Sequence, residues 1–260
     1  MQATMESQPP DDQPPAPVQN VSQAPSISAM RVKTTPAAVL SQSSVRRDSP
    51  SLASLRLRAY AVYGCLLAYV PATILGAWAG AAFLPGTVDG TGEYLSYDQE
   101  KFMRWALEFY GVVFLLTVIF FSLWIWRAAK TLRRMGIVTA VGSPGAAVWS
   151  FFLPVIWWWK PYAVVRTLWQ VAMDPNDWDN VAITQALPLW WSAWIGQWVS
   201  AFAVFGVEWI VMGSDKRYFE IVVLWVFAAL GVVAALSLLI VVMQTTRGLG
   251  RQLRNRQPAS

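Results

Sequence analysis

The sequence contains no histidine and only one cysteine among its 260 residues. Without histidine, the chain lacks the usual general base at neutral pH and the commonest metal ligand. With Cys65 alone, it can form neither a disulfide within the chain nor a thiolate metal site of its own. These absences predict a protein that is not an enzyme, with no catalytic residues, no metal site and no bound cofactor.

Charged residues are also scarce, at 13% of the chain against 55% hydrophobic residues. Soluble domains carry about 25% charged residues, so this composition indicates a protein whose surface meets lipid. The 16 Trp agree with this, because Trp and Tyr collect at the headgroup level of a bilayer. The net charge of +5 comes from basic residues that flank apolar segments, which favours membrane topology over nucleic-acid binding.

Composition divides the chain into three parts. Residues 1–54 are rich in Pro, Ser, Gln and Ala and predict a disordered cytoplasmic tail. They show no apolar run followed by a cleavage signal, so we expect no secretory signal peptide. Residues 55–246 predict a membrane domain, and residues 247–260 predict a short basic cytoplasmic tail.

Four apolar segments are long enough to cross about 30 Å of hydrocarbon at about 1.5 Å per helical residue. They are residues 61–84, 105–126, 186–207 and 221–243. The first contains Pro71, which a membrane helix tolerates as a kink. The sequence therefore predicts an all-α, polytopic membrane protein with four transmembrane helices.

The basic residues predict the orientation of these segments. Of the 20 Lys and Arg, 16 lie before the first segment, between the second and third, or after the fourth. The remaining four are Lys101, Arg104, Lys216 and Arg217. By the positive-inside rule, we expect a multi-pass protein of the plasma membrane with both termini in the cytoplasm.

Residues 143–172, between the second and third segments, are too apolar for a loop and too interrupted for an ordinary span. Ser143 is a favourable N-cap with Pro144 at the first helical position, and Pro154 should break that helix about three turns later. A second helix is expected from Lys160, with Val164, Val165, Leu168 and Trp169 as its apolar stripe and Arg166 on the other side. Because both neighbouring spans require cytoplasmic ends here, this broken-helix segment either re-enters the membrane or lies in its interface.

Several short blocks in and around this segment carry a resemblance to a known family. They are Trp126-Arg127, Lys130, Leu132, Ser143-Pro144-Gly145, Pro154, Trp159-Lys160-Pro161-Tyr162, Arg166, Trp169 and Leu189-Trp190-Trp191. Over roughly residues 60–243 the chain resembles a bacterial membrane family catalogued as a domain of unknown function (DUF4328). The resemblance implies a four-helix domain of the bacterial inner membrane and no established activity. The chain departs from the family pattern at Thr131, Trp157 and Ala163, where amides are frequent.

The broken-helix segment also holds the candidate contact residues for a lipid or a partner. They are Trp157, Trp158, Trp159, Lys160, Tyr162, Arg166 and Trp169. The rings either form a cage for a cationic or lipid headgroup, or anchor the segment at headgroup depth while Lys160 extends toward lipid phosphate. The expected partners are the lipid bilayer, anionic lipid headgroups, and either a cytoplasmic protein or further copies of the chain.

Two acidic residues close to the spans, Glu108 and Glu208, are candidate intramembrane carboxylates. Such groups serve proton relays in some membrane proteins. Both lie near the outer ends of their segments, however, and Arg104 stands four residues before Glu108, where the two could pair. Ordinary placement at the interface is the alternative interpretation.

Two functional hypotheses follow. The leading one is a non-enzymatic membrane module that binds a lipid or a partner through its cytoplasmic broken-helix segment. The alternative is a small transporter or channel component. It would have to act as an oligomer, because four helices with few polar faces leave little room for an aqueous path.

Overall fold

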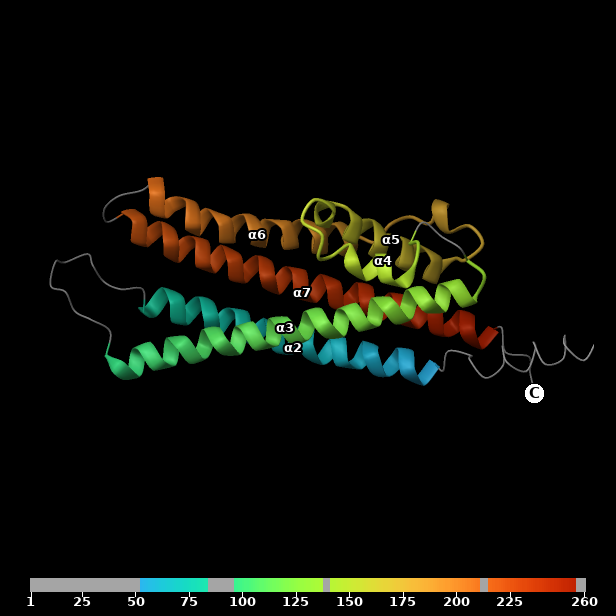
Figure 1. Ribbon diagram of the computed structural model, residues 1–260, viewed down its shortest axis with the longest axis horizontal. Helices are drawn as coiled ribbons and strands as arrows, with labels where there is room; N and C mark the ends of the chain where they lie inside the picture. Colours follow the sequence, from blue (N-terminus) through green and yellow to red (C-terminus); the bar gives the residue numbers. More distant parts are fainter. Residues whose placement is uncertain (1–51, 84–95, 138–140, 211–214, 256–260) are drawn as a thin grey trace, which may run out of the picture. The chain divides into compact units, whose positions relative to one another are not determined.

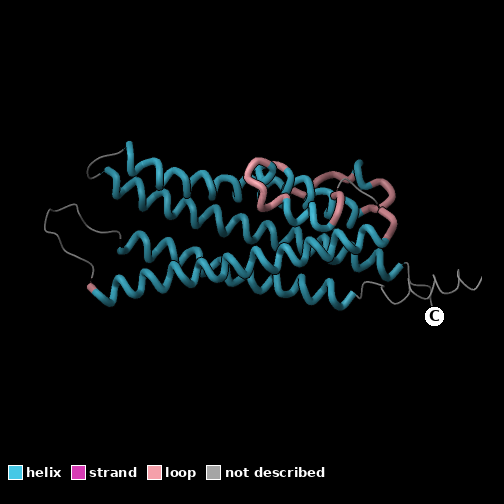
Figure 2. Tube along the Cα trace, viewed as in Figure 1, coloured by secondary structure: helices cyan, strands magenta, loops and turns pink. Residues whose placement is uncertain are grey.

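The computed structural model describes residues 52–83, 96–137, 141–210 and 215–255, without the side chains of residues 83, 204–210 and 215–217. This part of the chain consists of helices and connecting loops and contains no strand (Figure 2). The predicted all-α fold is therefore confirmed for these residues. Of the predicted N-terminal tail, residues 1–51 lie outside the described residues.

Four long helices account for most of the described chain (Figure 1). They are α2 (Leu52–Phe83), α3 (Tyr97–Arg134), α6 (Ala186–Ile210) and α7 (Asp215–Asn255). The start of α3 shows why a helix forms there: Ser96 and Gln99 make a reciprocal capping box that satisfies two free backbone amides. Within α2, the helix continues through Pro71, whose side chain is exposed.

Three of the four are long and apolar enough to cross a membrane: α2, α3 and α7. Helix α6 occupies the remaining predicted segment, although the side chains of its last seven residues are not described. Large apolar side chains on the outer face of α3 stay exposed, which suits contact with lipid. They include Leu107, Val112, Leu115, Leu116, Ile119 and Leu123.

Two helices extend beyond the boundaries that composition predicted. Helix α2 begins at Leu52, inside the predicted tail, and α7 continues to Asn255, through most of the predicted basic tail. Arginine is a good helix former, so basic residues that follow an apolar run need not end the helix. Arg247, Arg251 and Arg254 therefore project from a helix rather than from a separate tail.

Helix α7 packs against both α2 and α6, while α2 also packs against α3 (Figure 1). The backbones of α3 and α6 do not approach each other as closely as those of the other pairs. Aromatic rings occupy the space between them. The hydrophobic core includes the fully buried Val62, Trp124, Leu187 and Val241. This arrangement leaves α3 and α6 as the looser pair of neighbours.

The broken-helix segment forms α4 (Pro144–Trp149), a 3₁₀ turn η3 (Ile156–Trp158) and α5 (Lys160–Met173). The predicted start is confirmed: the Ser143 hydroxyl accepts a hydrogen bond from the amide of Ala146 at 3.1 Å. The first helix is shorter than predicted and ends well before Pro154. The chain turns there, and the Phe151 ring packs edge-on against Phe121 of α3, with centroids 5.7 Å apart.

Candidate functional site

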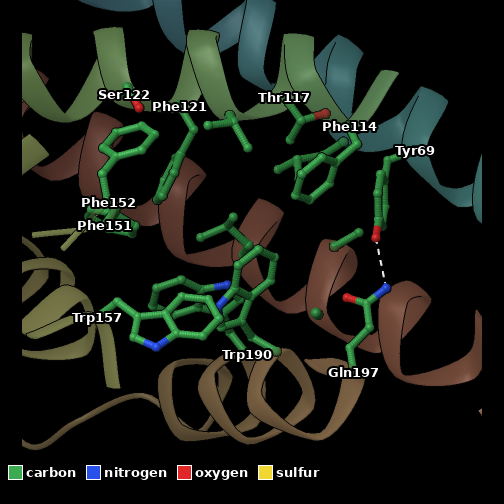
Figure 3. Close-up of a pocket in the computed structure, with 16 residues that line it drawn as sticks. Tyr69, Phe114, Thr117, Phe121, Ser122, Phe151, Phe152, Trp157, Trp190 and Gln197 are labelled. Atoms are coloured by element: carbon green, nitrogen blue, oxygen red, sulfur yellow. Dashed lines mark hydrogen bonds between the residues drawn. The ribbon is translucent and has the colours of Figure 1, made fainter. Parts of the chain in front are cut away.

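An apolar cavity of about 220 Å³ lies among the helices beside the broken-helix segment (Figure 3). All four long helices and residues 151–157 contribute to its walls. The lining residues are Leu66, Tyr69, Phe114, Thr117, Val118, Phe121, Ser122, Phe151, Phe152, Trp157, Trp190, Trp194, Gln197, Ala234, Ala235 and Leu238. No charged residue of the described chain is among them. The cavity is therefore suited to an uncharged, largely apolar occupant.

Paired aromatic rings hold the cavity open between α3 and α6. The rings of Phe114 and Trp194 stack with centroids 6.3 Å apart, and Phe121 meets Trp190 edge-on at 6.3 Å. Trp157 closes one end from the broken-helix segment (Figure 3), and its ring centroid lies 5.0 Å from that of Trp198. These bulky rings separate the two backbones, and the space that they leave unfilled is the cavity.

A buried polar network forms one edge of the cavity. The Gln197 side-chain amide donates to the Tyr69 hydroxyl at 2.8 Å (Figure 3), and this hydroxyl lies 3.1 Å from that of Tyr110. The network thereby connects α6, α2 and α3. Gly231 of α7 makes room for it, because a Cβ there would lie 2.7 Å from the Gln197 amide nitrogen. These polar groups satisfy one another at the edge of an otherwise apolar space.

The structure distributes the predicted tryptophan cluster over different surroundings. Trp157 lines the cavity, whereas Trp158 and Trp159 remain 44% and 55% exposed. Tyr162 packs toward Trp191 of α6, with ring centroids 6.2 Å apart. The cluster thus places one ring in the cavity and leaves two on the surface, where they can act as interfacial anchors.

Helix α5 buries the face that its sequence predicted. Val164, Val165 and Leu168 are almost fully buried, which confirms the predicted apolar stripe. Lys160 and Arg166 are half-buried, and the Arg166 Nε atom lies buried without a hydrogen-bond partner in the described structure. Both cations therefore lie at the margin of the packed region rather than in open solvent.

Helix α5 is held on α7 by contacts that involve its backbone. A Cβ at Gly248 would overlap the carbonyl oxygen of Ala172, so glycine permits the close approach. One turn further along α7, the Gln252 side-chain amide donates to the carbonyls of Val171 at 2.7 Å and Ala172 at 3.0 Å. This amide satisfies carbonyls that the end of α5 leaves free.

A third contact reinforces the docking of α5: the Trp169 indole donates to the Gln244 side-chain oxygen at 2.8 Å. Gln244, Gly248 and Gln252 are spaced four residues apart and so share one face of α7. These three residues and the Tyr69 network were not predicted from the sequence. Polar residues and glycines within apolar helices indicate contact with another part of the chain. They do not show which helix supplies the partner.

The two candidate intramembrane carboxylates stay predictions. Glu108 is exposed on α3, and the Glu208 side chain lies outside the described residues. Arg104 pairs with Glu100 at 2.7 Å, so its predicted pairing with Glu108 is wrong. Helical side chains point toward the helix N-terminus, and an acid four residues before a base is the better orientation. Within the described ranges, no group of three or more potential ligands is arranged to hold a metal.

The comparisons with known proteins agree with the resemblance. A family model described as "Domain of unknown function (DUF4328)" matches residues 100–247, somewhat displaced from the expected 60–243. The matched range includes the broken-helix segment and the α3, α6 and α7 walls of the cavity. No curated protein and no solved structure matches the chain.

Proposed function

Because the chain belongs to the family described as Domain of unknown function (DUF4328), which names no activity, we propose a function from its geometry. The protein is a non-enzymatic membrane module that binds the hydrocarbon chain of a membrane lipid in the apolar cavity. The broken-helix segment acts as one wall of that binding site. The observation that carries this proposal is the uncharged cavity closed by Phe151, Phe152 and Trp157.

The topology that goes with this proposal has four spans in the plasma membrane and both termini in the cytoplasm. Helix α6 supports the fourth span, since its 25 residues extend about 37 Å and its first 22 carry no charge. The start of α2 and the ends of α3 and α7 carry the arginines nearest the broken-helix segment. The positive-inside rule favours the cytoplasm for that end.

The size of the cavity limits what it can hold. Its volume of about 220 Å³ exceeds the roughly 150 Å³ of an apolar cavity that takes up benzene, but it is below the roughly 300 Å³ of pockets that enclose a drug-sized ligand. The cavity therefore fits a stretch of hydrocarbon chain rather than a whole lipid. An acyl chain is the apolar ligand that a membrane supplies to helices of this kind.

The broken-helix segment is proposed to lie in the interface rather than to cross into the hydrocarbon. The exposed rings of Trp158 and Trp159 and the half-buried cation of Lys160 suit headgroup depth. The transporter alternative lacks comparable support, because no charged side chain of the described residues lines the cavity.

Photolabelling tests the proposal directly. The full chain, in lipid nanodiscs, is exposed to a phospholipid that carries a photoreactive diazirine on one acyl chain, and labelled peptides are mapped. We expect labels within residues 114–122 and 190–197, which line the cavity from opposite sides. Ala235→Phe should reduce this labelling several-fold, because the new ring occupies the cavity.

The matched control is Leu236→Phe, which adds a ring to the neighbouring, exposed position of the same helix. It should leave labelling of the cavity peptides unchanged. If the probe labels outward-facing residues of α3 alone, or if both phenylalanine variants reduce labelling equally, the cavity does not bind the chain and the proposal is wrong.

A further inference from the structure

A second hollow of about 970 Å³, which we call the basic groove, lies between α2, α5 and the last turns of α7. Its charged lining residues are all arginines: Arg56 from α2 and Arg247, Arg251 and Arg254 from α7. No aspartate or glutamate of the described chain lines it. Four positive charges therefore share one groove, with no compensating carboxylate from the described ranges.

The arginines are exposed and available to a ligand. None of the four forms an ion pair within the described part of the chain. Arg247, Arg251 and Arg254 follow one another at intervals of four and three residues, so they project from one face of α7. Like charges at this spacing repel one another, and a bound anion would relieve that repulsion.

Aromatic and apolar side chains complete the groove. Tyr60 and Tyr63 line it from α2, and Trp169 lines it from α5 with its indole fixed by Gln244. Met173 contributes an apolar surface. Arginines mixed with Tyr and Trp at the end of membrane-crossing helices are typical of the depth at which lipid headgroups lie.

We propose that the basic groove binds the phosphate of an anionic phospholipid headgroup. Arginine pairs with phosphate through two parallel hydrogen bonds, and basic pockets between membrane helices on the cytoplasmic side are suited to anionic headgroups. The groove and the apolar cavity have no lining residue in common. Headgroup binding is thus a second function, independent of chain binding in the cavity.

The experiment compares two lipids with identical acyl chains. The full chain is purified in non-ionic detergent, freed of lipid, and titrated with dioleoyl phosphatidylglycerol or dioleoyl phosphatidylcholine, and bound lipid is counted by native mass spectrometry. The wild-type chain should prefer the anionic lipid. Arg247→Gln/Arg251→Gln should reduce that preference about 30-fold, at roughly 1 kcal/mol for each basic residue lost.

Two further variants separate a site from general charge. Lys130→Gln/Arg133→Gln removes the same charge from the end of α3, outside the groove, and should leave the preference unchanged. Arg247→Lys/Arg251→Lys keeps the charge but loses the paired hydrogen bonds to phosphate, so its preference should fall between those of the wild type and the Arg247→Gln/Arg251→Gln variant. If both glutamine variants lost the preference for the anionic lipid equally, the lipid would be attracted by general positive charge, and the proposal would be overturned.

Competition distinguishes a headgroup from a free anion. Inorganic phosphate at millimolar concentration should not displace phosphatidylglycerol, because it lacks the glycerol and chains that contact the apolar part of the groove. Displacement by inorganic phosphate alone would identify a general anion site and exclude a headgroup site. Failure of chain binding in the cavity would lower the binding of both lipids together and leave their ratio unchanged, so the two proposals fail separately.

Discussion

The apolar cavity and the basic groove both use the broken-helix segment, but the chain builds them by different means. At the cavity, Trp157 meets α6 through ring contacts, and α3 and α6 are kept apart by bulky aromatic pairs. At the groove, Trp169 belongs to a helix held on α7 through Gly248 and through hydrogen bonds to its own backbone carbonyls. The broken-helix segment thus lines two hollows of different chemistry, and its two ends are held by different kinds of contact.

This difference has a mechanical consequence. Ring pairs keep their attraction over a range of centroid distances and so tolerate small shifts, whereas a hydrogen-bonded backbone in close contact with another helix allows little movement. We therefore expect substitutions at the α5–α7 contact to affect stability most. Substitutions around the cavity should alter ligand binding with smaller losses of stability.

The largest effect is expected from Gly248→Leu. The new side chain would overlap the Ala172 carbonyl, which is backbone and cannot rotate away, so α5 must move off α7. The free energy of unfolding should fall by about 3 kcal/mol, the upper range for overpacking. Thermal unfolding in detergent measures the change. Gly64→Leu is the control, since nothing lies within 4 Å of a Cβ there; an equal loss in both variants would contradict the expected contact.

Gln252→Leu should have the next largest effect. It removes the donor that satisfies the Val171 and Ala172 carbonyls, at a cost of about 1 to 2 kcal/mol. Hydrogen exchange should accelerate at the end of α5 before the rest of the chain. Gln252→Glu keeps the shape but cannot donate from its carboxylate, so it should behave like the leucine variant. A stable glutamate variant would show that the amide does not fix α5.

Gly231→Ala tests the polar edge of the cavity. Its Cβ would lie 2.7 Å from the Gln197 amide nitrogen, a movable side-chain end, so the amide should shift away from Tyr69. We expect a loss of about 1 kcal/mol in the wild-type chain and almost none when Gln197 is already alanine. A double-mutant cycle of thermal stabilities measures this coupling. Independent, additive losses would show that the two residues do not interact.

The smallest effects are expected when a tryptophan at either end of the broken-helix segment is replaced by phenylalanine. Trp169→Phe keeps an aromatic ring but loses the hydrogen bond to Gln244, and should cost about 1 kcal/mol. Trp157→Phe loses no hydrogen bond of the described structure, and should cost roughly half as much or less. Chemical or thermal unfolding compares the two. Equal costs would remove the proposed difference between the two regions.

The start of the broken-helix segment and the buried face of α5 were predictable because their causes are local. Ser143 and Pro144 begin a helix through capping and a fixed φ, and Val164 and Leu168 lie on one helical face. The early end of α4 was not predictable, because the chain turns where Phe151 can pack against Phe121. That partner lies on another helix, and its position depends on the whole fold.

The sequence by itself determined that this chain forms long apolar helices, where they lie, and which family it belongs to. Hydrophobicity, helix caps and charge act over a few neighbouring residues, so they can be read along the chain. Only the tertiary structure decided that Trp157 enters a cavity while Trp169 lines a groove, and that Arg56 joins the arginines of α7. Those outcomes require helices distant in sequence to meet, and a periodic pattern shows which face is apolar but not which helix covers it.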